Sequence, residues 1–349
     1  MRNRYVDLLR AVAIVRVVTY HTLGFAWLTV AFPAMGLMFA LGGSLMAASL
    51  DRGGDGLGLK AIGRRMRRIV VPFWVLGVFA VVLMSLMGGL EHTWRLVLWL
   101  LPVDDPPTSE KGGVWFSQIW YVRSYLWFII LSPAMLWLFR KAPIPTLLVP
   151  FGILVAMWET GHGTGGMVRD FFMYAPMWML GFAHHDGTLQ RISRKVLWPA
   201  CLVMGGIGLA ILYSHPGPRG YDMNDAPVAD ALWSTAFLLV MLHAAPAALS
   251  LGAAEPAVEA INRRALTIYL WHEAVIIAVR LAAVAAGVSL VGPYGGMLQL
   301  VLVFGLVALV VLALGWVEDL AARRRPRLIP LPSRPSAGRL KERAQPVPV

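Results

Sequence analysis

The sequence is poor in charge, in cysteine and in acidic residues. Only 14% of its 349 residues are charged, whereas 58% are hydrophobic and the mean hydropathy is +0.65, which excludes an ordinary soluble domain. The single cysteine, Cys201, excludes an intrachain disulfide and a multi-cysteine metal cluster. The 19 acidic residues are outnumbered by 31 basic ones, but the basic residues lie between apolar runs, without an aromatic-basic nucleic-acid motif. A membrane, and no nucleic acid, is therefore the expected partner of this positive charge.

Ten apolar segments indicate an all-α, polytopic integral membrane protein with about ten transmembrane helices in one bundle. A helix that spans a bilayer needs about 17–25 residues, and only the fifth and sixth segments are shorter. We expect residues 1–320 to form this transmembrane domain and residues 321–349, rich in Pro and Arg, to form a disordered basic cytoplasmic tail. The segments are predicted at residues 6–30, 32–50, 69–90, 120–139, 146–158, 171–185, 196–213, 228–251, 265–287 and 296–317.

The Lys and Arg residues between the segments predict the orientation of the chain. With ten spans both termini share one side, whose connections hold 23 of the 31 Lys and Arg residues, against 4 on the opposite side. Cytoplasmic connections carry the excess of positive charge in membrane proteins. We therefore expect a multi-pass protein of the plasma membrane with both termini in the cytoplasm. A signal peptide is the alternative for the first segment, but charges interrupt it and no small-x-small cleavage site follows.

That first segment carries charges that a simple membrane anchor does not need: Asp7, Arg10, Arg16 and His21. The offset of eleven from Arg10 to His21 places the two side chains within about 20° of one helix face, roughly 16 Å apart. Asp7 lies near this face and is expected to pair with Arg10, whereas Arg16 lies about 120° away. A charge at the bilayer centre costs about 2.5–3.5 kcal/mol on insertion scales. The row therefore predicts a functional site in the bundle interior or a water-filled cavity.

A basic run, 64–68, forms the most positively charged internal connection. Such clusters commonly mark the cytoplasmic side and contact anionic membrane lipids. The alternative is that these guanidinium groups bind the phosphates of a cytoplasmic donor, for which planar and permanently charged forks are suited. The sequence leaves both roles open.

Two later groups of residues are also candidates for a site. Trp120 and Tyr121 lie where the chain enters the bilayer, as in an aromatic belt. His272 and Glu273 lie in the ninth segment, where an offset of seven puts Glu273 and Arg280 on one helix face and allows an intramembrane ion pair bridged through a neighbour. The paired histidines near residue 185 lack further ligands, so no metal is expected.

These features, in this order, resemble the membrane acyltransferase-3 family. The family's Arg-x10-His signature, preceded by Asp-x-x-Arg, matches Asp7, Arg10 and His21. Four later motifs match in order: a Phe-Phe-x-x-Ser-Gly-like stretch at 39–43, a basic run before a proline at 64–72, a Trp-Tyr pair at 120–121 and a Tyr-Leu-x-His at 269–272. One position departs from the family, because Gly42 stands where the family has serine. Any role of that hydroxyl is absent here or taken by another residue.

The resemblance implies an O-acyltransferase that moves an acyl group, commonly acetyl, from cytoplasmic acyl-CoA to a hydroxyl of a carbohydrate, a glycolipid or, in some members, an antibiotic. It makes Arg10 and His21 the essential pair. An imidazole is suited to take a proton from a hydroxyl at neutral pH, so His21 is the candidate general base. Direct transfer and an acyl-imidazole intermediate both stay open. We expect CoA to contact Arg10, Arg64, Arg65, Arg67 and Arg68, and the acceptor to contact Trp120, Tyr121 and His272.

A transporter or exporter of a polar or glycosylated substrate is the alternative, because buried charges in a ten-span bundle also mark substrate and proton pathways. No convincing inverted repeat supports it, and the charges concentrate in one helix row rather than in two matching halves. The sequence therefore favours the enzyme.

Overall fold

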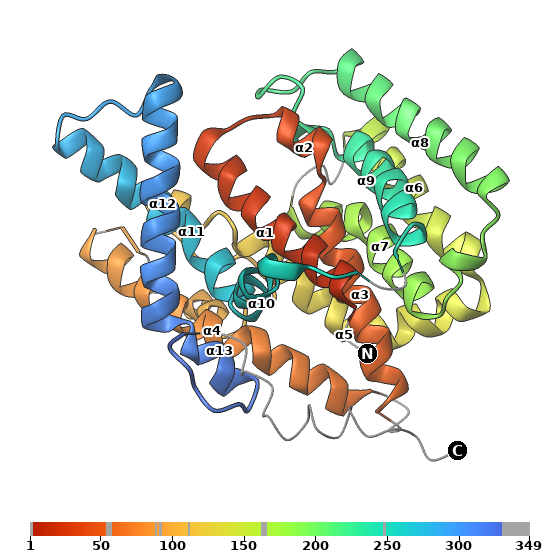
Figure 1. Cartoon of the computed structure of the whole chain (residues 1–349), viewed down its shortest axis with the longest axis horizontal. Helices are drawn as coiled ribbons and strands as arrows, with labels where there is room; N and C mark the ends of the chain where they lie inside the picture. The colour runs from red at the N-terminus through yellow and green to blue at the C-terminus, as the bar shows by residue number, and fades with distance from the viewer. Residues whose placement is uncertain are drawn as a thin grey trace.

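The computed structural model describes residues 3–53, 58–87, 89–90, 93–110, 112–161, 166–246 and 249–329. The regular structure of these residues is helical, which confirms the all-α prediction (Figure 1). Two short 3-10 helices, η1 and η2, lie between α4 and α5 at Trp94–Trp99 and Gly113–Phe116. The α-helices are α1 (Arg4–Leu23), α2 (Trp27–Ala31), α3 (Ala34–Asp51), α4 (Leu59–Leu86), α5 (Ile119–Lys141), α6 (Pro143–Thr160), α7 (Gly166–His185), α8 (Arg194–Ser214), α9 (Pro227–His243), α10 (Glu255–Arg263), α11 (Ala265–Ala285), α12 (Gly292–Leu314) and α13 (Trp316–Ala321).

The helices form a central group and an outer group. The central core is built largely from α3, α4, α5 and α7, with contributions from α1, α9 and α11, and includes the stacked rings of Phe128 and Trp178, whose centroids lie 5.1 Å apart. Helices α8 and α12 lie at opposite edges of the view in Figure 1, and their exposed side chains include Leu202 and Val301. An outward-facing apolar surface of this kind suits contact with lipid. A polar site is therefore expected among the central helices rather than on the outer ones.

Helices α3 and α7 approach each other closely because glycine lies at their contact. A Cβ atom on Gly43 would collide with the carbonyl oxygen of Trp178, and one on Gly181 would collide with that of Ala40. Small residues allow such close approach in membrane bundles, where van der Waals packing replaces the hydrophobic effect. Gly42 is also restricted, since a Cβ there would lie 2.7 Å from Tyr125 Oη. A serine at this position would require the side chains of Tyr125 and Trp178 to shift.

Seven helices are long and apolar enough to cross a membrane by length and composition among the described residues, so the chain is a polytopic membrane protein. The other three predicted spans correspond to α1, α7 and α9, of which α1 carries too many charges and α9 is too short to meet these criteria. Each of the ten segments overlaps a helix, but ten crossings are not confirmed. Helix α4 begins at Leu59, so the basic run 64–68 is helical rather than a connection. Most of the predicted tail, 330–349, lies outside the described residues.

Candidate active site

Two cavities of similar size lie against α1, and we name them by their lining. The histidine pocket, about 640 Å³, is lined by residues that include Arg16, Tyr20, His21, Trp120, Arg123, Asp170 and Arg219. The basic pocket, about 700 Å³, is lined by residues that include Asp7, Tyr121 and seven arginines, Arg10, Arg52, Arg64, Arg65, Arg68, Arg263 and Arg324. Both volumes lie in the usual range for ligand sites. Helix α1 thus carries Arg10 into one cavity and His21 into the other.

His21 is held near the end of α1 by the local chain geometry. The helix stops at Gly24, which adopts a left-handed conformation with a φ of 69° and donates its N–H to the carbonyl of Tyr20. A residue without a Cβ is favoured in that conformation. Arg280 of α11 donates to the carbonyl oxygens of His21 and Thr22, at 3.3 and 3.0 Å. A cation is favourable against the carbonyls at a helix C-terminus, so α11 fixes the end of α1 that carries His21.

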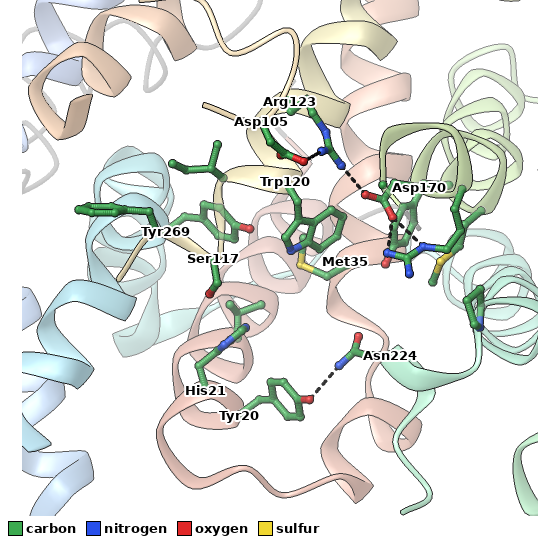
Figure 2. A pocket seen from close by; sticks show the side chains of 18 of the residues that line it. Tyr20, His21, Met35, Asp105, Ser117, Trp120, Arg123, Asp170, Asn224 and Tyr269 are labelled. Carbon is green, nitrogen blue, oxygen red and sulfur yellow. Dashed lines mark hydrogen bonds and ion pairs between the residues drawn. The ribbon is translucent and has the colours of Figure 1, made fainter. Parts of the chain in front are cut away.

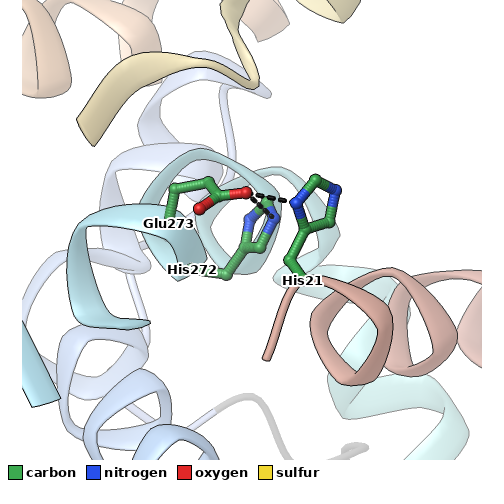
Figure 3. Close-up of side chains that lie close together, drawn as sticks. All are labelled: His21, His272 and Glu273. Carbon is green, nitrogen blue, oxygen red and sulfur yellow. Dashed lines mark ion pairs between the residues drawn. The ribbon is translucent and has the colours of Figure 1, made fainter. Parts of the chain in front are cut away.

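His21, Glu273 and His272 form a compact polar cluster (Figure 3). The Nδ1 atom of His21 contacts Oε1 of Glu273 directly, and Nε2 of His272 lies 3.9 Å from the same oxygen. The Nδ1 atom of His272 lies 2.6 Å from the carbonyl oxygen of Tyr269, which can only accept, so this nitrogen carries a proton. A carboxylate that accepts from Nδ1 of His21 fixes its tautomer and leaves Nε2 as a base.

The same cluster resembles a set of metal ligands, because the donor atoms of His21, His272 and Glu273 lie within 4.8 Å of one another. Ligand nitrogen and oxygen atoms lie about 2.0–2.2 Å from zinc, so around one ion they stand roughly 3 Å or more apart. Nδ1 of His21 and Oε1 of Glu273 are instead in direct contact. The geometry suits a hydrogen-bonded pair better than a metal site, and the expectation of no metal stays a prediction.

Ion pairs build one wall of the histidine pocket (Figure 2). Arg123 is 2% exposed and binds Asp105 and Asp170, with Nη2 2.7 Å from Oδ2 of Asp170. Arg169 binds the other oxygen of Asp170 at 2.8 Å. A buried charge needs such partners, since desolvation of an unpaired ion is costly. These pairs tie the connection between η1 and η2, which carries Asp105, to α5 and α7 around the cavity.

The opposite wall is a hydrogen-bonded group around Tyr20. Its hydroxyl donates to Oδ2 of Asp222 at 2.5 Å and accepts from Asn224 Nδ2 at 3.0 Å. Arg219 donates to the same hydroxyl at 3.0 Å and pairs with Asp225. Burial acts to raise the pKa of Asp225, but the hydrogen bonds and charge of Arg219 hold it below its usual value. The connection before α9 is thereby fastened to α1.

The basic pocket differs because most of its arginines have no carboxylate partner. Arg263 pairs with Glu259 at 3.6 Å. Among the described residues, no ion pair within 4.0 Å is found for Arg10, Arg52, Arg64, Arg65, Arg68 or Arg324. Burial raises the pKa of Glu318 above its usual value, against the hydrogen bonds of Thr267 and the charges of Arg10 and Arg264. The seven arginines of the lining outnumber its three carboxylates, Asp7, Glu318 and Asp319, so the pocket is positively charged, as an anion site requires.

Aromatic side chains of α5 and α11 separate the two cavities. Trp120 lines the histidine pocket and its neighbour Tyr121 lines the basic pocket, whereas Tyr269 lines both. The rings of Tyr121 and Tyr269 lie 4.8 Å apart, and the Tyr269 hydroxyl donates to the carbonyl of Gln118 at 3.0 Å. Tyr269 is thus common to the walls of both cavities.

Several sequence hypotheses need correction in detail. Glu273 and Arg280, for which a bridged ion pair was considered, instead contact His21 and the carbonyls at the end of α1, respectively. His272 was expected to contact the acceptor, yet it is fully buried behind His21 and is not among the residues that line either cavity. Arg67 is not among the lining residues of the basic pocket, unlike Arg64, Arg65 and Arg68. Arg10 lines the basic pocket, and His21 and Trp120 line the histidine pocket. Tyr121, which was expected beside Trp120 at the acceptor, lines the basic pocket instead.

Sequence reasoning missed or misplaced other residues of the histidine pocket. Arg16 was placed away from the row of Arg10 and His21, but the cavity extends around α1 far enough to include it. The pairing of Arg123 with Asp170 joins helices whose contact no local pattern specifies. The signal that could have found these residues is their charge within apolar segments, which marks functional or paired groups.

Comparison with models of protein families shows to which family the chain belongs. The model of the acyltransferase-3 family, described as an acyltransferase domain, matches residues 3–317. The chain belongs to the acyltransferase-3 family. Its two cavities are therefore those of a membrane acyltransferase. Comparisons with curated proteins and with solved structures find no match.

Proposed function

We propose that the protein is an O-acyltransferase that moves an acyl group, most simply acetyl, from acyl-CoA in the basic pocket to a hydroxyl of a carbohydrate or glycolipid in the histidine pocket. The observation that carries the proposal is the contact between Nδ1 of His21 and Glu273, because it leaves Nε2 as a base on the wall of a cavity. A general base of this kind contributes about 10²–10⁴-fold to a rate.

The reaction transfers one acyl group and one proton. His21 Nε2 takes the proton of the acceptor hydroxyl while the hydroxyl oxygen attacks the thioester carbonyl carbon. The new C–O bond forms, the C–S bond breaks, and the proton on His21 passes to the CoA thiolate. The carboxylate of Glu273 stabilises the imidazolium between the two proton transfers. His21 is thus the catalytic residue, and Glu273 positions it.

The donor side of the proposal rests on the arginines of the basic pocket. CoA carries a diphosphate and a further phosphate on its nucleotide part, and guanidinium groups bind phosphate through paired hydrogen bonds. Arg64 and Arg68 lie one turn apart on α4 and, together with Arg10 of α1, line one cavity. The pantetheine arm and its thioester then extend past Tyr269 toward His21.

The sidedness of the reaction is also part of the proposal. The basic pocket is lined by residues next to the N-terminus, by the run 64–68 and by Arg324, all on the side predicted to be cytoplasmic. The histidine pocket is lined by Asp105, Arg169 and Arg219 from connections predicted to be on the outer side. This arrangement supports a plasma membrane protein with cytoplasmic termini that takes acyl-CoA inside and modifies an acceptor outside.

Purified protein in lipid nanodiscs tests the proposal. Incubation with radiolabelled acetyl-CoA and a panel of sugars and membrane glycolipids is expected to give acetylated product, and His21→Ala is expected to abolish it. Acetyl transfer that persists undiminished in a folded His21→Ala protein would contradict the role of His21. Flux of a glycoside through proteoliposomes without acyl-CoA, and without any acyl transfer, would instead support an exporter.

A further inference from the structure

Arg16 is the charged side chain of the histidine pocket that the mechanism does not use. The other arginines of the lining each face a carboxylate: Arg123 and Arg169 bind Asp170, and Arg219 binds Asp225. Among the described residues, no carboxylate lies within 4.0 Å of the Arg16 side chain. Its contacts are a hydrogen bond from Nε to the carbonyl of Leu28 at 3.1 Å and the ring of Tyr20 at 4.9 Å. Both terminal nitrogens of a permanently charged group are therefore free at the cavity.

The nearby carboxylates are already engaged by other groups. Asp222 accepts from the Tyr20 hydroxyl and from the backbone N–H of Asn224. Asp230, whose charge acts on Arg16 from more than 4.0 Å away, accepts from the Ser234 hydroxyl at 2.6 Å. The ring of Tyr20 and the carbonyl of Leu28 hold the guanidinium in place without a direct ion pair. An unpaired, oriented Arg in a cavity is suited to a planar or tetrahedral oxyanion.

We propose that Arg16 binds an anionic group of the acceptor, a phosphate or a carboxylate, while His21 deprotonates the acceptor hydroxyl. This inference rests on the proposed function for the identity of the acceptor, but the anion site itself does not. The offset of five between Arg16 and His21 separates them by about 7.5 Å along α1. The anionic group therefore lies several bonds away from the hydroxyl that is acylated, as in a phosphorylated sugar or a sugar acid.

The test compares three probes that differ in one group: methyl glucoside, methyl glucoside phosphate and methyl glucuronide. With acetyl-CoA as donor, Arg16→Gln is expected to raise the KM of the preferred anionic probe about tenfold, which corresponds to about 1.4 kcal/mol, and to leave the KM of the neutral probe within about twofold. Arg16→Lys retains the positive charge but not the forked guanidinium, so its KM for the anionic probe is expected to lie between those of the wild type and Arg16→Gln. Whether the phosphate or the carboxylate probe responds more strongly identifies the anion.

Arg140→Gln is the matched control, because Arg140 is an exposed arginine that pairs with Asp51 and Asp186 and lies outside the lining of both cavities. Binding of the probes to the nanodisc protein without donor, measured by saturation-transfer NMR, gives a second readout that needs no turnover. Selective loss of anionic-probe binding in Arg16→Gln supports the site even if no acetyl transfer occurs, in which case the proposed function alone fails. Equal changes for neutral and anionic probes, or no change, would overturn the site and leave Arg16 as a structural contact of Leu28.

Discussion

The two cavities of this protein have nearly equal volumes, about 640 and 700 Å³, but differ in how many of their arginines are paired with carboxylates. In the histidine pocket Arg123 and Arg169 share the buried carboxylate of Asp170, so these charges build the wall. In the basic pocket Arg10, Arg64 and Arg68 have no such partners among the described residues. Paired arginines keep a fixed shape, whereas unpaired ones are available to an anion that enters and leaves.

This difference assigns distinct kinetic roles to the two cavities. Groups that contact CoA phosphates in both the bound and the transition state change KM, whereas groups that act on the transferred proton change kcat. Mutations in the basic pocket should therefore weaken donor binding, and mutations around His21 should slow turnover. If both kinds of mutation change the same kinetic constant, KM or kcat, the two cavities do not have separate roles.

The largest effect is expected for His21→Gln. Loss of the base should lower kcat about 10³-fold, with the KM of acetyl-CoA changed less than about threefold, because the proposed site for the donor phosphates is the other cavity. His243→Gln is the control, since His243 contacts the Leu189 carbonyl at 2.9 Å outside both cavities. Steady-state acetyl transfer in nanodiscs measures both constants, and a large rise in KM with unchanged kcat would contradict the assignment.

The next largest effect is expected for Glu273→Ala. Without a carboxylate at Nδ1, His21 loses its fixed tautomer and the partner of its imidazolium, so kcat should fall about 10²-fold. Glu273→Gln keeps an oxygen acceptor and should retain more of the turnover than the alanine variant. Because both substitutions remove the charge, this recovery separates orientation of His21 from electrostatic stabilisation. Equal losses in the two variants would argue against the orienting hydrogen bond.

The fold and parts of the site could be predicted because they depend on local patterns. Apolar length located the helices, whereas Arg10 and His21, predicted to share one helix face, line two different cavities. The partner of Glu273 could not be predicted, because helical spacing identifies only neighbours on one helix, whereas His21 comes from a helix about 250 residues earlier. Arg16 was placed outside the site because its position on the helix is about 120° from the row of Arg10 and His21. It lines the histidine pocket all the same, because that cavity extends around more than one face of α1.

Neighbouring arginines of the basic run 64–68 are expected to differ in their effect on donor binding, because Arg68 lines the basic pocket and Arg67 does not. Arg68→Gln, within the lining, should raise the KM of acetyl-CoA about tenfold, the cost of a charge-assisted phosphate contact. Arg67→Gln is the matched control, because this neighbour on α4 is absent from the lining and should change KM less than about twofold. Kinetics at low and high salt should show a stronger salt dependence for the wild type than for Arg68→Gln. Equal effects of both variants would mean that the run acts through general surface charge.

The smallest effect, but the most selective one, is expected where the cavities meet. Tyr269 lines both pockets, so its ring limits the group that can pass from donor to acceptor. Tyr269→Ala should raise the ratio of kcat/KM for butyryl-CoA to that for acetyl-CoA about fivefold, because space for one or two methylenes changes binding by about 1–2 kcal/mol. Tyr269→Phe keeps the ring and loses only the hydrogen bond to the Gln118 carbonyl, so its ratio should match the wild type. Each ratio is taken within one protein preparation, so partial misfolding cancels. An unchanged ratio in Tyr269→Ala would place the acyl route elsewhere and separate the two cavities as independent sites.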